Sequence, residues 1–366
     1  MADFADFVVR SGMGERYFAM SSVPGTCFQA EAEELLARYR EKAAGTLPIW
    51  LRFHLSDIAN QAGILRQIVG MELPLVGQPP VNGSRLALEA YHLIPSENIP
   101  KLNRTASLCE LLLENYRLLW FRREELTTQG SGPQMHEEFE EAEKLLTQYG
   151  GNIAENLQRT WIYCRDIDNN YAPLVTARRE LFQRYGLLPD THYIASTGIE
   201  GTSEPHNRLV RMDSFALFGH RPEQIEYMQE LTHLSPTHRY GVTFERGTRI
   251  IYGDRSHYYI SGTASIDSEG RIVYPGDSVR QAERLVDNVE ALLENHGGKL
   301  TDLKQATVYL RDPADTRAVE TVLECRLAPW TARIMVKGAV CRPGWLVEMD
   351  AIAVNENGNT IFRNLE

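Results

Sequence analysis

Apolar and polar residues follow the periods of both strands and helices along this chain. In the last third, an apolar segment that begins at Tyr258 and another that ends at Val354 predict two strands. Between them the pattern predicts an amphipathic helix, a strand at residues 305–311, a second helix and a strand that contains Arg333. Strands and helices mixed in this order predict an α+β domain.

The same order of elements recurs in the middle of the chain. Residues 150–166 and 297–312 both begin with Gly-Gly after a predicted helix, continue into an apolar strand and end with Arg-Asp. Residues 209–217 begin Leu-Val-Arg-Met-Asp and match residues 346–354, which begin Leu-Val-Glu-Met-Asp. Self-similarity over this distance indicates an internal repeat.

A weaker third copy is predicted at the N-terminus. Residues 17–22 predict a first strand and residues 29–42 predict a helix with apolar residues at helical spacing. Residues 49–57 resemble the central strand of the other copies, and residues 86–93 resemble their last strand. In this alignment Glu89 stands where the last copy has Glu348.

We therefore predict three units. The first, a degenerate copy, spans residues 1–100, the second spans residues 101–235 and the third spans residues 236–366. Within the second unit, the leucine-rich segment 105–126 is long enough to form a packed helix, so we predict a helical insert there. The alternative is that these are generic α+β segments that share short strings.

Composition excludes several classes of function. The chain has 366 residues, enough for two or three hydrophobic cores. Its formal net charge of −11 argues against a nucleic-acid partner, because phosphate binding needs clustered Lys and Arg. No apolar run approaches a membrane span, and the acidic start lacks the basic region of a signal peptide. We therefore predict a cytoplasmic protein that contacts neither nucleic acid nor membrane.

Cysteine and histidine spacing predicts no metal site and no cofactor. The five cysteines are scattered and form no Cys-x-x-Cys pair, which is typical of reduced thiols. The ten histidines show no metal-binding spacing, and no glycine-rich phosphate loop is present.

Two charged residues on predicted strands are candidates for chemistry. Arg333 stands in a β-branched, apolar strand, where an arginine is costly unless it is paired. A guanidinium can hold a carboxylate through two hydrogen bonds, although a neighbouring acid is the alternative partner. Strand alternation places Glu348 and Asp350 on one face of the last strand. A carboxylate beside a substrate can position water or move a proton, and a solvated acid is the alternative.

The order of elements, with Arg333 fifteen residues before Glu348 and Gly262 in Ile-Ser-Gly-Thr, resembles the RidA/YjgF family of small-molecule deaminases, also called endoribonuclease L-PSP. That family forms compact, chorismate-mutase-like α+β domains that assemble as trimers with pockets at the subunit interfaces. The resemblance implies that Arg333 binds a substrate carboxylate and that Glu348 orients water for hydrolysis of an enamine or imine. It also implies that Gly262 and Tyr240 line the pocket. Three copies in one chain would make an internal pseudo-trimer.

Other strings resemble the chorismatases, which share this core and act on chorismate. These strings are residues 261–266, 274–277, 159–163 and 196–199, and the Cys-Arg pair at residues 341–342. The resemblance implies that Cys341 and Arg342 belong to the pocket wall. Chorismatases typically lack the arginine found here at position 333, and their Tyr-Pro-rich segment is replaced by residues 239–246.

The sequence thus predicts a cofactor-free hydrolase that acts on a small carboxylate, with one pocket between the third unit and a neighbouring unit. Deamination of an enamine or imine is the leading hypothesis. The alternatives are chorismatase-type chemistry and metabolite binding without catalysis. Chorismate is a dianion, so it would need a second cation, supplied by Arg342 or by an arginine of the middle unit. Trp161, Tyr163 and Arg165 either face this pocket or belong to the core. The protein is expected to be a monomeric pseudo-trimer or a homo-oligomer.

Overall fold

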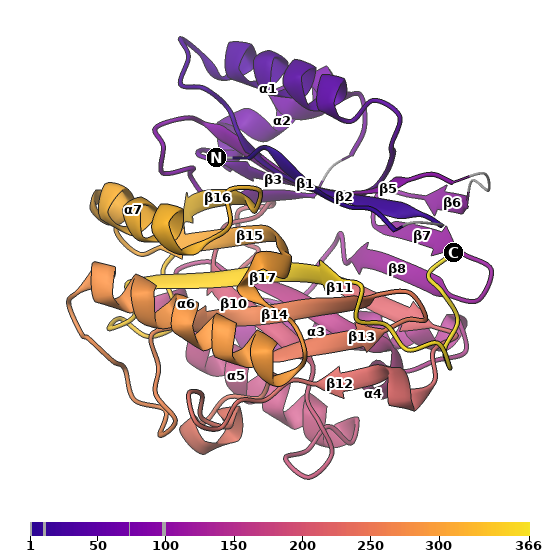
Figure 1. Ribbon diagram of the computed structural model, residues 1–366. Coiled ribbons are helices and arrows are strands. Elements are labelled where there is room, and N and C mark those ends of the chain that lie inside the picture. Colours follow the sequence, from indigo (N-terminus) through magenta and orange to yellow (C-terminus); the bar gives the residue numbers. More distant parts are fainter. Residues whose placement is uncertain (1, 10–11, 73, 97–99) are drawn as a thin grey trace.

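The computed structural model describes residues 2–9, 12–72, 74–96 and 100–366. Its strands form three sheets, and its longer helices lie on the periphery while the sheets face one another in the interior (Figure 1). None of the described helices is long and apolar enough to cross a membrane. The predicted α+β class is confirmed, and each sheet belongs to one of three copies of the same unit.

The first sheet has five strands in the order β1-β2-β5-β3-β4. Its elements are β1 (Phe4–Phe7), β2 (Gly14–Ser21), α1 (Phe28–Lys42), β3 (Leu47–Leu55), α2 (Ile58–Val69), β4 (Leu75–Gly77) and β5 (Leu86–Ile94). Helix α1 covers β2 and β5, and α2 covers β3 and β4.

The second sheet has six strands in the order β10-β9-β11-β8-β7-β6. Its elements are β6 (Lys101–Arg104), β7 (Leu108–Leu112), β8 (Arg117–Arg122), α3 (Ser131–Gln148), α4 (Ile153–Asn156), β9 (Leu157–Cys164), α5 (Ile167–Arg184), β10 (Ala195–Glu200) and β11 (Val210–Phe218). Helices α3 and α5 pack on each other and on the strands β11 and β9.

The third sheet has six strands in the order β12-β13-β14-β17-β15-β16. Its strands and longer helices are β12 (Ile225–Tyr227), β13 (Gly247–Ile251), β14 (Ser256–Ala264), α6 (Ser278–Asn295), β15 (Leu303–Leu310), α7 (Thr316–Arg326), β16 (Ala332–Lys337) and β17 (Val347–Asn355). Four short 3₁₀ helices are η1 (Pro222–Gln224), η2 (Thr237–Tyr240), η3 (Leu300–Asp302) and η4 (Pro313–Asp315). Strand β12 joins this sheet although it precedes residue 236, so we propose a unit boundary nearer residue 220.

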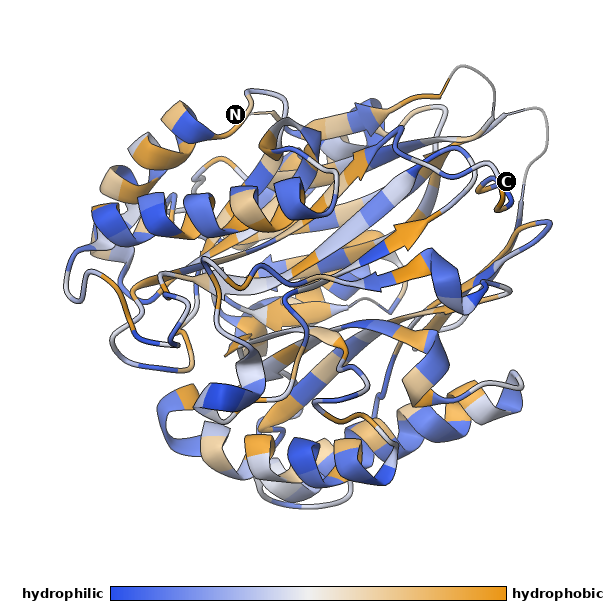
Figure 2. Cartoon of the chain, turned by 60° about the horizontal axis from the view of Figure 1, so that its bottom comes forward, coloured by the Kyte–Doolittle hydropathy of each residue, from blue (hydrophilic) through white to orange (hydrophobic). Residues whose placement is uncertain are grey.

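The helices form where local signals and an apolar stripe agree. The carboxylate of Asp277 accepts a hydrogen bond from the backbone N–H of Arg280 at the start of α6 (3.0 Å), a cap that contributes about 1 kcal/mol. Leu285, Val289 and Leu292 then bury one face of this helix. Figure 2 shows hydrophilic and hydrophobic residues side by side on the outer helices, as expected for helices with one face in water.

The predicted helical insert at residues 105–126 is wrong. This segment forms the hairpin β7–β8, closed by a turn in which Leu113 N donates to Tyr116 O (2.9 Å). Strand β8 is buried on both faces, so its residues read as a continuous apolar run rather than an alternating one. The hairpin occupies the place of β1–β2 and β13–β14 in the other units, and the middle unit is therefore a full copy.

The edge strands of the three units are linked in a ring. Each unit has one parallel pair of strands at an edge of its sheet: β3–β4 in the first unit, β9–β10 in the second and β15–β16 in the third. Isolated bridges then connect the ends of these edges across units: Gly77 with Thr202, Ile199 with Val340, and Pro80 with Val336. In addition, β10 packs on β14 and β16 packs on β2. Each unit thus presents its edge to the next.

Register identifies the equivalent residues of the three last strands. Each pair of central and last strands has a bulge at the same place. Two residues after the bulge along the central strand, the facing residue of the last strand is an acid: Glu89 opposite Arg52, Asp213 opposite Trp161 and Asp350 opposite Thr307. Glu89 is therefore the counterpart of Asp350. The sequence alignment, which places Glu89 at the position of Glu348, is wrong on this point. The position of Glu348 is held by Ala87 in the first unit and by Arg211 in the second.

These three acids join the units at the centre of the molecule. Each accepts a hydrogen bond from the neighbouring unit: Asp213 from Arg52 Nε (3.0 Å), Glu89 from Thr307 Oγ1 (2.5 Å) and Asp350 from Thr197 Oγ1 (2.8 Å). Arg52 also pairs with Glu89 (3.2 Å), and all of these side chains are buried. Because buried charges are costly when unpaired, this network fixes how the units meet.

Candidate functional site

A cavity of about 330 Å³ lies between the middle and third units. The middle unit contributes α5 and β10, and the third unit contributes η2, β14, β17 and the loop before β17. Five of the six residues predicted for the site line it: Tyr240, Gly262, Cys341, Arg342 and Glu348. The predicted position of the pocket, between the third unit and a neighbour, agrees with this cavity.

Glu348 reaches the cavity because strand β14 is irregular beside it. The register between β14 and β17 shifts between Ile260 and Thr263, so Gly262 sits in a bulge next to Glu348. A Cβ atom on Gly262 would collide with the Glu348 carboxylate. The backbone N–H of Gly262 donates to Thr197 Oγ1 of the middle unit (3.1 Å). Glycine at this position therefore makes room for the acid and brings the two units together.

The environment of Glu348 favours its neutral form. Its side chain is only 5% exposed, and burial, followed by repulsion from Asp350, raises its pKa to about 8, against the opposing charges of Arg159 and Arg246. Burial likewise raises the pKa of Asp350. Among the described residues, none donates a hydrogen bond to the Glu348 carboxylate. At neutral pH it is therefore a buried acid that can give a proton to a molecule in the cavity.

Arginines surround this acid without carboxylate partners. Arg178 and Arg179 come from α5, Arg246 precedes β13 and Arg342 precedes β17. None of the four forms an ion pair within the part of the chain that the structure describes. Arg178 is 1% exposed, and its Nε and Nη2 atoms have no hydrogen-bond partner there. Buried, unpaired cations are costly, so this cavity is built to receive negative charge.

Backbone carbonyls and aromatic rings hold the other arginines in place. Arg246 Nη2 donates to Ser235 O (2.8 Å), and Arg342 Nη2 donates to Tyr240 O (2.9 Å). The ring of Tyr240 lies 5.4 Å from the Arg246 guanidinium and 4.9 Å from that of Arg342. Tyr240 therefore helps to position two cations of the cavity lining. Burial raises the pKa of the Cys341 thiol to about 12, which suits a wall residue and not a nucleophile.

Arg333 lies elsewhere: the structure does not bring it together with Glu348 in one cavity. It lines a separate cavity between the first and third units. In the sheet, Arg333 pairs with Ala306, whereas Glu348 pairs with Tyr309. The two residues are thus three residues apart along the strands and two strands apart across them, or about 10 Å in each direction. A spacing of fifteen residues in sequence does not reveal this separation.

The residues Trp161, Tyr163 and Arg165 also lie outside the Glu348 cavity. Trp161 stacks on Trp50 at 5.8 Å, and Tyr163 is fully buried in the core. Arg165 donates to the backbone of Ser203 (2.9 Å). Of the two alternatives, core placement is correct for the aromatic pair.

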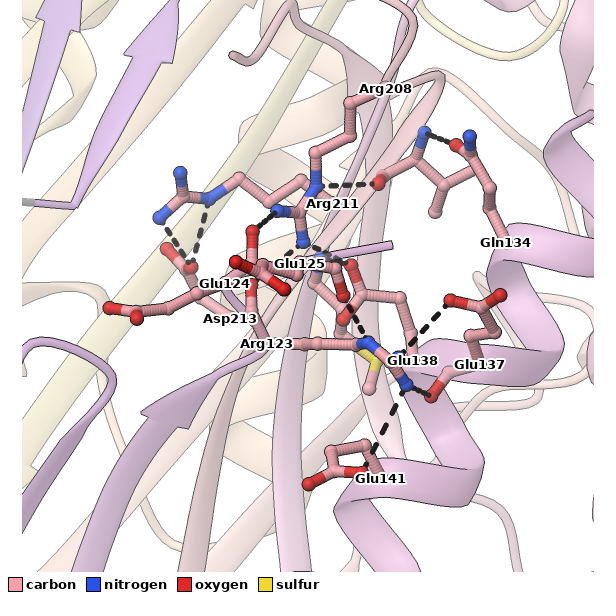
Figure 3. Close-up of polar contacts among 12 residues, drawn as sticks. Arg123, Glu124, Glu125, Gln134, Glu137, Glu138, Glu141, Arg208, Arg211 and Asp213 are labelled. Carbon is pink, nitrogen blue, oxygen red and sulfur yellow. Dashed lines mark hydrogen bonds and ion pairs between the residues drawn. The ribbon is translucent and has the colours of Figure 1, made fainter. Parts of the chain in front are cut away.

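The middle unit shows what replaces Glu348 in a copy without the acid. Arg211 pairs with Asp213 (3.3 Å) and donates to Leu75 O of the first unit (3.0 Å). Arg208 pairs with Glu138 (2.7 Å), and Figure 3 shows both pairs beside α3. All of these charges are satisfied within the protein, in contrast to the arginines around Glu348. No group of three potential metal-ligating side chains occurs among the residues described.

The fold and this cavity define a class of protein: an α+β chain with three copies of one unit and a buried acid between two of them. The sequence pattern of the family Endoribonuclease L-PSP matches residues 250–355, which include Gly262, Cys341 and Glu348. A RutC family protein of Pyrococcus abyssi is 33% identical over 99 residues, covering 27% of this chain and 78% of that protein. The chain therefore belongs to the RidA/YjgF family, to which the name endoribonuclease L-PSP also applies.

Two further proteins show different parts of this likeness. The 3-aminoacrylate deaminase RutC of Acinetobacter baylyi is 30% identical over 96 residues, covering 26% of this chain and 76% of that enzyme. The crystal structure of a chorismatase superposes on 94% of this chain and on all of its own, with a TM-score of 0.68 and 18% identity. The second likeness is one of fold, and it extends over all three units.

Proposed function

We propose that this protein is a cofactor-free hydrolase for a small dicarboxylate, with Glu348 as its proton donor. The observation that carries the proposal is a buried acid, neutral at pH 7, that faces a cavity lined by four arginines without carboxylate partners among the described residues, of which Arg178 and Arg246 are buried. One carboxylate leaves several of these cations unused, whereas two carboxylates can pair with Arg178 of the middle unit and Arg342 of the third. This charge demand favours a dianion over a monocarboxylate.

Chorismate is the first substrate to test, because the chain resembles chorismatases in both sequence strings and fold. Chorismate contains an enol ether, whose terminal carbon is electron-rich. Glu348 would donate its proton to that carbon, and positive charge would develop on the carbon bonded to the ether oxygen. Water would add there and return a proton to Glu348. The bond from the hemiketal carbon to the ring oxygen would then break as the hemiketal hydroxyl loses its proton and the ring oxygen gains one. The products are pyruvate and the ring alcohol.

The acid suits this step for electrostatic reasons. A proton donor works best when its pKa lies near the working pH, and that of Glu348 is about 8. After proton transfer, the carboxylate formed would be stabilised by Arg246 and Arg159, whose charges already act on it. The same residue therefore serves as acid first and as base for the incoming water second.

Deamination of an enamine remains the second candidate. It is favoured by the likeness to a 3-aminoacrylate deaminase, whose matched region is 30% identical. The chemistry begins in the same way, because an enamine also accepts a proton at its terminal carbon before water adds. Deamination differs from chorismate hydrolysis in the charge of the substrate, because an aminoacrylate carries one carboxylate. It also differs in the product, because ammonia is released.

Product analysis distinguishes these activities. Purified protein is incubated with chorismate and, separately, with 2-aminoacrylate generated in situ, and pyruvate and ammonia are both measured. Glu348-dependent pyruvate without ammonia from chorismate supports the dicarboxylate hydrolase. Glu348-dependent ammonia release from the enamine alone would replace it with a deaminase. Tight binding of chorismate with no product from either compound would mean that the site binds a metabolite without catalysis.

We further propose that the three units form a pseudo-trimer in which only the pocket between the middle and third units is catalytic. The ring of edge contacts and the equivalent acids Glu89, Asp213 and Asp350 support this arrangement. Only the last strand of the third unit carries a glutamate at the position next to the cavity.

A further inference from the structure

Thr197 links the middle unit to both neighbours of Glu348. It stands on β10 of the middle unit and is 1% exposed. Its hydroxyl donates to Asp350 Oδ2 (2.8 Å) and accepts from the backbone N–H of Gly262 (3.1 Å). Asp350 follows Glu348 by two residues on β17, and Gly262 lies against the Glu348 carboxylate. One hydroxyl group of the middle unit therefore contacts the residues on both sides of the acid.

The donors around Thr197 fix the direction of its hydrogen bonds. The Gly262 N–H and Arg159 Nη2 (2.5 Å) can only donate, so Thr197 accepts from both and gives its single hydrogen to Asp350. Asp350 also accepts from the Tyr309 hydroxyl (3.0 Å), and Arg159 Nη2 lies 3.4 Å from the same carboxylate oxygen. These donors stabilise the charged form of Asp350. A serine can make the same bonds as Thr197, whereas a valine of the same shape can make none of them.

Titratable and charged side chains approach Glu348 from the elements packed around it. They are Asp350 on its own strand, Arg159 on β9, Tyr171 and Arg178 on α5, Arg246 before β13 and Cys341 in the loop before β17. Burial raises the pKa of Tyr171 well above its usual value and that of the Cys341 thiol to about 12, so both are neutral at pH 7. The arginines favour the ionised form of Glu348, and Asp350, the acid of this set, favours the neutral form.

We propose that Thr197 is a positioning residue for the proton donor of the neighbouring unit: its hydroxyl holds Gly262 against Glu348 and keeps Asp350 charged beside it. This role rests on the proposed function of Glu348 as an acid. Without the hydroxyl, Asp350 loses a hydrogen bond that lowers its pKa, so it binds a proton more readily. Its repulsion of Glu348 then weakens, and the pKa of Glu348 falls toward its ordinary value. The middle unit thereby controls the acid of the third unit.

An isosteric substitution tests this role. Thr197→Val keeps the shape of the side chain and removes the hydroxyl. With chorismate as substrate, we expect kcat at pH 8 to fall about tenfold, the equivalent of one hydrogen bond. KM should stay nearly unchanged, because the cavity is lined by Ser196 and Gly198 on either side of Thr197 and not by Thr197 itself. The basic limb of the pH profile of kcat should move to lower pH, because Glu348 must be protonated to act. Thr197→Ser should restore both kcat and the basic limb.

Thr248→Val is the matched control. Thr248 is a fully buried threonine of β13, and its hydroxyl donates to Gln158 O (3.3 Å) across the same pair of units. This variant also loses a hydrogen bond between the units, but it should keep the kcat and the pH profile of the wild type. Equal kcat and equal basic limbs in the two valine variants would overturn the proposal, as would failure of Thr197→Ser to restore them.

Asp350→Asn keeps the proposal testable if Thr197→Val folds poorly. This variant removes the negative charge beside Glu348 and retains an oxygen that accepts a hydrogen bond from Thr197. The basic limb of its pH profile should therefore also move to lower pH. An unchanged limb would show that Thr197 does not act on Glu348 through Asp350, contrary to the proposal.

A second measurement locates the ionisation of Glu348 without a substrate. The free energy of unfolding of the wild type and of Thr197→Val is measured against pH, each beside the same protein with Glu348→Gln. The difference within each pair is lost as pH rises through the pKa of Glu348 in the folded protein. This loss should level off at a lower pH in Thr197→Val than in the wild type. If the wild type converts no chorismate, the proposed function fails and this comparison alone decides the role of Thr197, which matching curves would refute.

Discussion

The third unit carries two cavities that occupy equivalent places and differ in chemistry. Toward the middle unit, Glu348 meets arginines from α5 and from the loops around Tyr240 and Cys341. Toward the first unit, Arg333 stands alone opposite a strand that has Ala87 where the acid would be. A buried acid is present in one cavity, whereas the acids that line the other are partly exposed, although both cavities are built from the same unit.

This difference shows how a repeated chain can specialise. In three identical copies, all interfaces would carry the same residues. Here the three positions next to the interfaces hold alanine, arginine and glutamate. Figure 3 shows that the arginine is neutralised inside the protein by an acid two residues away. The shared core of acids is retained, so the copies diverge at the cavities and not at the contacts that hold them together.

The largest effect is expected from removing the proton donor. Glu348→Gln keeps the shape of the side chain and removes its proton, so kcat should fall about 10²- to 10⁴-fold with chorismate affinity retained. Glu356→Gln, an exposed acid just beyond β17, is the matched control and should behave as the wild type. Steady-state kinetics measure kcat, and equilibrium binding measures the affinity for chorismate. Undiminished kcat in Glu348→Gln would remove the acid from the mechanism.

Disrupting the buried ionic network at the centre of the molecule should have the next largest effect, which is on the free energy of unfolding and not on kcat. Arg52→Ala removes a buried cation shared by Asp213 and Glu89, whose remaining ion-pair partners are Arg211 and His54, and the free energy of unfolding should fall by about 3–5 kcal/mol. Arg271→Ala, which breaks an exposed ion pair with Asp267, should change it by less than about 1 kcal/mol. Denaturant unfolding measures the difference. Equal stability of the two variants would mean that this network does not hold the units together.

A smaller loss is expected from one cation of the catalytic cavity. Arg178→Gln removes a buried partner for a substrate carboxylate, so kcat/KM for chorismate should fall about 10- to 100-fold, mainly through KM. Arg184→Gln lies on the same helix in an exposed pair with Glu140 and is the control. If Arg178→Gln and Arg184→Gln have the same KM, the substrate carboxylate does not pair with Arg178.

Much of the fold could be predicted from the sequence, because the strands and helices of the first and third units follow clear periods. The hairpin at residues 108–122 could not, since a strand buried on both faces gives an apolar run without alternation. The repeat itself was readable from Gly-Gly and Arg-Asp strings. The correspondence of Glu89 with Asp350 was not, because it depends on a bulge that shifts the register.

The site was predictable only where a single unit supplies it. Gly262, Cys341 and Glu348 lie on the neighbouring strands β14 and β17 and on the loop before β17, all in the third unit, and short strings identify them. Arg178 was missed because it comes from another unit, although a signal existed: it falls among Leu174 and Leu181 on the buried stripe of α5. A charged residue on an apolar helix face marks either a buried pair or a ligand site. Arg333 was misplaced because sequence spacing does not specify which neighbour an edge strand faces.

The pH dependence of stability offers the finest test of the difference between the cavities. The pKa of Glu348 in the folded protein, about 8, lies above its ordinary value of 4.5. Between these values the folded state holds a proton that the unfolded state releases, so stability is lost as pH rises through this range and levels off above pH 8. Relative to Glu348→Gln, the wild type should lose about 3 kcal/mol between pH 6 and pH 9. Thermal or denaturant unfolding of both proteins measures this, and parallel pH curves would show that Glu348 is ionised in the folded protein and cannot act as the proton donor at neutral pH.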